Sequence, residues 1–194
     1  MSSDWRCEEH GAVPPFHVAH QPSTDVLRIV RRRAGVPVWA PWPLLPGWTI
    51  TGLGWAGDER APAVATAVAC SGPAPLGGVA DVVLVAEEPG VGLGARFAGI
   101  SGPDPGPLLT EELGTTAHAK VHAAGHPTPL WSIRAGDGRS AYVGEALGRW
   151  LWAVAWPVEA GYVLAEHLVL HDLREEQPGA LLFGAPSPYL RGTP

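Results

Sequence analysis

The sequence predicts an α+β fold, with an antiparallel sheet of about six strands and a helix near each end. Glycine (25) and proline (21) make up nearly a quarter of the 194 residues, which excludes a long-helix or coiled-coil protein. Short apolar runs separated by turn residues occur in two groups of three, and segments rich in helix formers flank them. Runs of strands between terminal helices are typical of α+β folds. A β-sandwich is the alternative.

Length and composition predict one principal domain. Apolar residues make up 46% of the chain and charged residues 16%, which is enough for a core and too little charge for a disordered chain. Residues 1–21 are polar, rich in histidine and expected to be irregular, with half of a zinc-ribbon knuckle. Residues 22–176 form the α+β domain, and the Gly/Pro-rich residues 177–194 are expected to be a loose tail.

The first helix is expected to begin after Ser23 or Thr24, either of which can cap it. Asp25 complements the helix N-terminus, and Gly35 ends the helix. Its apolar side chains share one arc, and the opposite arc carries Arg28, Arg31 and Arg32. These arginines indicate a solvated helix face, with a patch for phosphate or an acidic partner as the alternative.

Residues 36–48 contain four prolines and are expected to be extended and held on the domain by tryptophans. The predicted strands are 48–57, 63–71 and 80–87, followed by 130–134, 141–145 and 150–156. In the last strand Trp150, Trp152 and Trp156 share one face and the other face is also apolar, so this strand is predicted to be central. Tyr162 to Arg174 is predicted to be a helix packed on the sheet.

A glycine-rich stretch follows the third predicted strand. The backbone N–H groups of Gly90, Gly92 and Gly94 could bind an anion together with Arg96. However, two glutamates precede the glycines and would repel phosphate, and the spacing matches neither a P-loop nor a dinucleotide fingerprint. The alternative is a tight structural turn in which glycine permits a positive φ.

His126 is expected to lie in a loop between Gly125 and Pro127, where it could act as an acid, a base or a ligand. No nucleophile in a recognised context accompanies it, so the catalytic residues are unknown, and a turn-stabilising histidine is the alternative. The candidate ligand-binding residues are therefore Gly90, Gly92, Gly94, Arg96 and His126.

The most informative short motif is Cys7-x2-His10 followed by Gly11, which is half of a zinc ribbon. A structural zinc site needs four ligands, and the matching Cys-x2-Cys knuckle is absent because Cys70 stands alone in an apolar run. His17 and His20 are the other possible ligands. The alternative is that Cys7 and His10 are ordinary surface residues.

Four stretches, at residues 36–44, 67–78, 90–99 and 124–131, resemble an uncharacterised actinobacterial family with a domain of unknown function. The resemblance runs from Trp5 to about Arg174. It implies that many members begin with a Cys-x2-Cys knuckle followed by one like Trp5–Gly11, and that some carry an automatic phosphotransacetylase label. This chain lacks the first knuckle, so either the zinc site has been lost or the start codon has been placed too late. Zinc is expected only with a longer N-terminus.

The net charge of −6 argues against a nucleic-acid partner, and a small molecule or a protein remains possible. Without a signal peptide or a membrane-spanning apolar run, the expectation is a soluble cytoplasmic protein. The sequence favours a non-catalytic accessory protein or a protein that binds a small ligand or an anion. The alternatives are a small enzyme acting on a phosphorylated or acylated metabolite and a zinc-ribbon adaptor for a protein or nucleic-acid partner.

Overall fold

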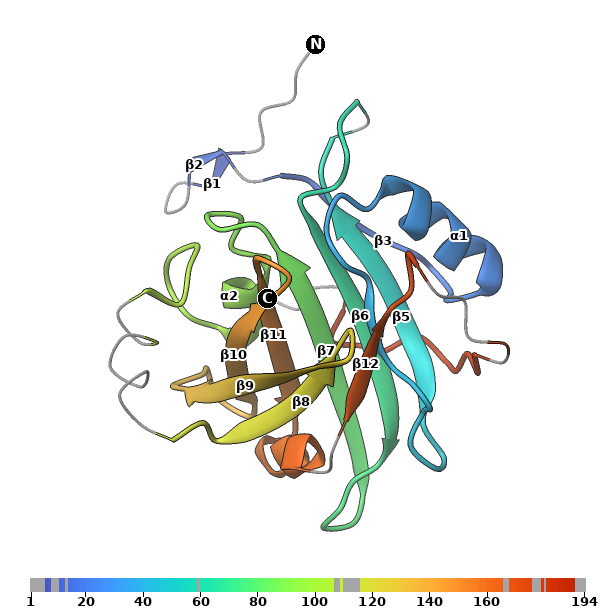
Figure 1. Ribbon diagram of the computed structural model, residues 1–194, viewed down its shortest axis with the longest axis vertical. Coiled ribbons are helices and arrows are strands. Elements are labelled where there is room, and N and C mark those ends of the chain that lie inside the picture. Colours follow the sequence, from blue (N-terminus) through green and yellow to red (C-terminus); the bar gives the residue numbers. More distant parts are fainter. Residues whose placement is uncertain are drawn as a thin grey trace.

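A computed structural model describes residues 6–7, 11–12, 14–58, 60–106, 109, 116–165, 168–175, 179 and 181–190. Within these residues, ten strands form one sheet in the order β3-β5-β6-β7-β11-β10-β9-β8-β12-β4, and β1 and β2 form a separate hairpin (Figure 1). The helices are α1 (Thr24–Arg33), α2 (Leu93–Ala98) and the 3₁₀ helix η1 (Val158–Ala165). The strands are β1 (Arg6–Cys7), β2 (Gly11–Ala12), β3 (Phe16–Val18), β4 (Trp39–Pro41), β5 (Thr49–Ala56), β6 (Ala65–Pro73), β7 (Val79–Glu87), β8 (Ala119–Ala123), β9 (His126–Ile133), β10 (Ser140–Ala146), β11 (Arg149–Trp156) and β12 (Val169–Asp172).

This sheet corrects the predicted fold class. The six predicted strands correspond to β5, β6, β7, β9, β10 and β11, but β3, β4, β8 and β12 extend the sheet on both sides. The sheet is mixed rather than antiparallel because β12 pairs parallel with β8. The strands also belong to one hydrogen-bonded sheet, so a sandwich of two separate sheets does not describe them.

The predicted helix from Tyr162 to Arg174 is wrong. The 3₁₀ helix η1 ends at Ala165, and Val169–Asp172 is strand β12 between β8 and β4. The buried carboxylate of Asp172 accepts a hydrogen bond from Val38 N (3.0 Å) and pairs with the Arg174 guanidinium at 2.7 Å. The contact with Val38, 134 residues away, and the pairing of β12 with β4 and β8 favour a strand where the local composition favours a helix.

The segment expected to be irregular at residues 1–21 also contains regular structure. The β1–β2 hairpin pairs Cys7 with Gly11, and β3 pairs antiparallel with β5. His126, expected in a loop, is the first residue of β9. Strand β3 is only three residues long, and its pairing is fixed by β5, which is about 40 residues away in sequence, so local patterning gave little signal for it.

The sheet curls so that its β12–β4 end packs over β6 and β7, and β4 contacts both of these strands. We call the concave side the inner face. Its core combines side chains of β4 and α1 with those of the central strands, including Trp39, Val30, Leu84 and Leu151. Cys70 is fully buried there, and burial raises the pKa of its thiol to about 12. A thiol with so high a pKa is a packing group rather than a nucleophile.

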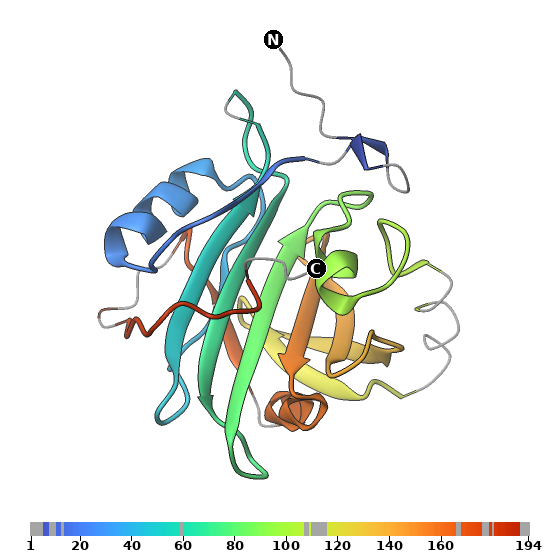
Figure 2. The same cartoon turned by 180° about the vertical axis from the view of Figure 1, so that it is seen from behind.

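The opposite side, which we call the outer face, is covered by α2 and by residues 185–190 (Figure 2). Trp152, Val154 and Trp156 of β11 are buried in this second core, and Leu151 and Ala153 are buried in the inner core. The prediction that this strand is central is therefore confirmed. Trp156 stacks on Tyr189 with ring centroids 4.6 Å apart, which fastens the C-terminal segment to this face.

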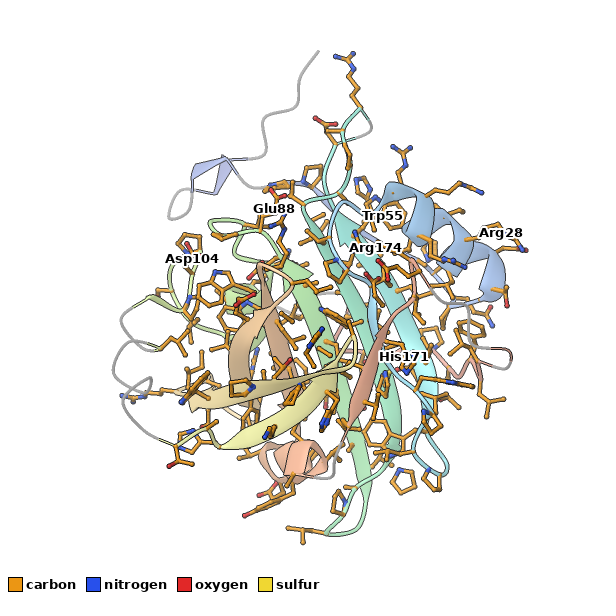
Figure 3. All side chains as sticks on the ribbon, viewed as in Figure 1. Arg28, Trp55, Glu88, Asp104, His171 and Arg174 are labelled. Carbon is orange, nitrogen blue, oxygen red and sulfur yellow. The ribbon has the colours of Figure 1, made fainter. Side chains whose placement is uncertain are left out.

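Helix α1 forms as predicted. The Ser23 hydroxyl accepts a hydrogen bond from Val26 N (3.3 Å), and Leu27 and Val30 are buried. The exposed Arg28 pairs with Asp25 at 2.7 Å and projects from the outside of the helix in Figure 3. Within the described part of the chain, no helix has the length and apolar character needed to cross a membrane.

Candidate functional site

The described structure has a groove of about 490 Å³ on its outer face, within the size range of small-molecule sites. Its lining residues place it at the end of the sheet where the β6–β7 hairpin turns. In Figure 2 this hairpin and α2 lie at opposite ends of β7. Three segments line it: Thr49 and Thr51 of β5, residues 71–73, 78, 79 and 81 of the β6–β7 hairpin, and residues 185–188 of the C-terminal segment.

The C-terminal wall of the groove is held by backbone pairing with β5. Gly184 N donates to Ile50 O (2.9 Å), and Ser187 N donates to Thr51 O (2.8 Å). This pairing places residues 185–188 beside the start of β5, where β3 does not reach. The groove therefore depends on contacts between segments more than 130 residues apart.

The floor of the groove is polar because the outer-face residues of β6 and β7 change from apolar to polar at this end of the sheet. On β6, the outer-face positions are alanines from Ala65 to Ala69 and then Ser71. On β7, Val85, Val83 and Asp81 lie on the same face, and Asp81 is the one nearest the β6–β7 turn. Since residues i and i+2 of a strand share a face, the hydroxyl and the carboxylate meet where the apolar core ends.

Three side chains in the floor form a hydrogen-bonded chain. Thr51 Oγ1 and Ser71 Oγ are 2.8 Å apart, and Ser71 Oγ donates to Asp81 Oδ1. Among the described residues that line the groove, Asp81 is the only charged one. The groove thus combines hydroxyl groups, one carboxylate and proline surfaces, which suits a small polar ligand.

The glycine-rich stretch lies at the other end of β7, where it wraps around a buried carboxyl. Glu87 Oε2 accepts hydrogen bonds from Leu93 N (2.6 Å) and Gly94 N (3.2 Å). Gly92 has a φ of +81°, and a Cβ at Gly94 would lie 2.3 Å from Trp152 Cδ1. Glycine is required at these two positions for the turn and for contact with the indole, respectively.

Burial raises the pKa of Glu87 to about 7, and the Asp104 carboxylate adds to the rise. The Gly94 and Leu93 N–H groups oppose it, as does the nearby Trp152 indole N–H. Even so, Glu87 Oε1 and Trp152 Nε1 make no hydrogen bond of normal geometry within the described residues. Glu87 is 0% exposed, so its carboxyl group is not accessible to a ligand.

Asp104 closes the same turn from outside. Its Oδ1 accepts hydrogen bonds from Gly90 N (2.8 Å) and from Trp150 Nε1 (2.9 Å). Asp104 lies on the same side of the molecule as Glu88, which pairs with Arg149 at 3.5 Å (Figure 3). Two of the backbone donors considered for an external anion, those of Gly90 and Gly94, are thus engaged by carboxylates of this chain, as is the Leu93 N–H group.

The structure separates the other two predicted ligand residues. Arg96 is exposed on α2, which packs on β7 and β11, whereas His126 is exposed at the turn between β8 and β9. Neither residue lines the groove on the outer face. That Gly90, Gly92, Gly94, Arg96 and His126 bind a common ligand remains a prediction.

Of the predicted zinc ligands, Cys7 lies in β1, and His10 falls outside the described residues. The described part of the chain contains no group of three or more His, Cys, Asp or Glu side chains able to hold a metal ion. His17, one of the two other candidates, stacks on Trp55 with ring centroids 5.2 Å apart, and its Nε2 lies 3.2 Å from Gly57 O.

Fold and site together define a protein with one curled mixed sheet and a polar groove at one end of its outer face. The chain belongs to a family of unknown function, DUF6758, whose model matches residues 1–190. The predicted membership in a family of unknown function is confirmed. No curated protein and no solved structure matches the chain.

Proposed function

We propose that this protein binds a small polar molecule in the groove formed by β5, the β6–β7 hairpin and residues 185–188. The observation that carries the proposal is the hydrogen-bonded chain of Thr51, Ser71 and Asp81 in the floor of an opening of about 490 Å³. Polar groups that converge in a concave site are what orient a small ligand. The proposal agrees with the non-catalytic binding role that the sequence favours.

The groove can be filled without disturbing the core. Val79 lines it and is 68% exposed, so Val79→Trp adds an indole at the opening rather than in the sheet interior. Leu76 is 69% exposed on the same hairpin but is not part of the lining, so Leu76→Trp is a matched control. Both variants are expected to fold like the wild type, because exposed positions away from special features tolerate substitution.

We expect a screen of small polar molecules, followed by protein-observed NMR, to find compounds that bind the wild type and the Leu76→Trp variant equally. Binding to the Val79→Trp variant should fall at least about tenfold, because the indole occupies the groove. If no small polar compound binds, or if the compounds bind the Val79→Trp variant as well as the control, the groove is not a ligand site.

We propose in addition that Cys7 and His10 belong to half of a zinc ribbon, as the family resemblance implies. The supporting observation is that Cys7, the first residue of the motif, pairs with Gly11, the residue that follows it, in the β1–β2 hairpin. Two ligands bind zinc much more weakly than four.

We expect elemental analysis of the purified 194-residue chain to find well under one zinc per molecule. The zinc content of the Cys7→Ser variant should be the same. Stoichiometric zinc in the monomer would contradict the half-site.

A further inference from the structure

We propose that the groove selects a positively charged ligand that donates hydrogen bonds, such as a primary ammonium group, over neutral or anionic molecules of the same size. This inference rests on the proposed binding function and specifies its ligand class. It follows from the charge of the groove and from the direction of the hydrogen bonds in its floor.

The charge of the groove is set by Asp81. The described lining contains no arginine, lysine or histidine, so nothing in the wall offsets the carboxylate. A carboxylate has about four acceptor positions, and Ser71 uses one of them at Oδ1. The remaining capacity suits N⁺–H donors, because hydrogen bonds between charged groups are about twice as strong as neutral ones.

The direction of the hydrogen bonds leads to the same ligand class. A carboxylate oxygen can only accept, so Ser71 donates its single hydroxyl proton to Asp81. Ser71 Oγ can then only accept in its 2.8 Å contact with Thr51 Oγ1, so the Thr51 hydroxyl donates to it. The hydroxyl protons of Thr51 and Ser71 both point toward Asp81, so these three side chains offer a ligand lone pairs. A ligand that reaches these atoms must bring the protons.

An anion would meet the opposite arrangement. It would lie against the Asp81 carboxylate and oxygen lone pairs, with no cationic side chain in the described lining to compensate. Desolvating a carboxylate beside an unpaired anion is unfavourable. A neutral alcohol can donate one hydrogen bond to this floor but gains no electrostatic attraction to the Asp81 carboxylate. The expected preference is therefore ammonium first, alcohol second and carboxylate last.

Three probes of matched size separate these cases: propylammonium, propan-1-ol and propionate. Each is titrated into the wild type, into Asp81→Asn and into Asp137→Asn, with affinity measured by NMR. Asp137→Asn removes one negative charge from an exposed turn outside the groove and so controls for net charge. Thr51→Val leaves the carboxylate in place and removes the first hydroxyl of the chain. Circular dichroism verifies that each variant is folded.

We expect the wild type and Asp137→Asn to bind propylammonium at least about tenfold more tightly than either other probe. Asp81→Asn should lose this preference, and Thr51→Val should keep part of it. If the three probes bind the groove equally, or if Asp81→Asn keeps the preference, the charge inference is wrong while the proposed binding function stands. If none of the probes and no compound of the wider screen binds in the groove, both proposals fail.

Discussion

Trp152→Ala is expected to lower the free energy of unfolding by about 3–5 kcal/mol, the range for removing a large aromatic side chain from a packed core. Trp152 is 0% exposed in the central strand β11, and its indole lies directly against Gly94. Strands β7 and β10 flank β11 on its two sides, so the backbone has little freedom to collapse into the cavity that the substitution would leave. Urea unfolding followed by circular dichroism measures the change.

Trp55→Ala is the control, because Trp55 is only half-buried and stacks on His17 near the edge of the sheet. Trp55→Ala should lower the free energy of unfolding by clearly less than Trp152→Ala does. If Trp152→Ala does not fold, Trp152→Phe provides a milder test. It keeps most of the apolar volume and removes the buried Nε1, which makes no hydrogen bond of normal geometry within the described residues. A loss below about 1 kcal/mol in Trp152→Ala would contradict the buried position of this side chain.

Glu87 is expected to make the protein less stable as pH rises from about 5 to 8. Its pKa of about 7 in the folded protein exceeds the ordinary value of 4.5, so the folded state keeps a proton that the unfolded state releases. The contribution to stability is complete below pH 4.5 and is lost as pH rises through 7. By proton linkage, the loss between pH 5 and 8 is roughly 2–3 kcal/mol.

Glu87→Gln should remove this pH dependence, because glutamine keeps an acceptor for Leu93 N and Gly94 N and carries no charge. Glu88→Gln makes the same change in charge one residue away, at a partly exposed side chain, and should keep the dependence. Urea unfolding at several pH values compares the three proteins. A wild-type stability that rises from pH 5 to 8, or an equal dependence in Glu87→Gln, would show that Glu87 is not buried as a neutral acid.

The central strands could be predicted from the sequence because their signals are local. Strands β5, β6 and β7 have near-continuous apolar runs, and turn residues such as Asp137-Gly138 separate the later strands. The missed strands are short or depend on distant partners. Strand β4 is three residues long and lies beside several prolines, and β12 pairs with residues of β8 that lie 47 positions earlier. In β8, Ala119, Val121 and Ala123 are buried in alternation, and this pattern could have indicated a strand.

The glycine-rich turn was recognised from the sequence, but its partner was not. Glu87 was expected to repel a bound phosphate, whereas its carboxyl group accepts the Leu93 and Gly94 N–H groups. Nothing in the spacing indicates whether such donors face an external anion or a carboxyl group from the preceding strand. The contact depends on Glu87 turning into the core beside Trp152, which is a tertiary feature.

The sequence contains a weaker indication of the groove than of the glycine-rich turn. Ser71 and Asp81 each end a row of alternating small or branched apolar residues, and the β6–β7 register places them directly opposite one another. A polar residue at the same end of two paired strands could have indicated a site there. The third wall, residues 185–188, could not be foreseen because it reaches the groove from a Gly/Pro-rich tail.

NMR chemical-shift mapping with propylammonium tests the central claim, that the groove is the ligand site of this protein, most directly. Saturating probe should shift backbone amides of the groove, at residues 49–51, 71–72, 78–81 and 187, and leave distant amides unchanged. Shifts confined to residues 90–96 or to His126, with the groove amides unchanged, would contradict the claim and favour the glycine-rich turn or the β8–β9 hairpin instead.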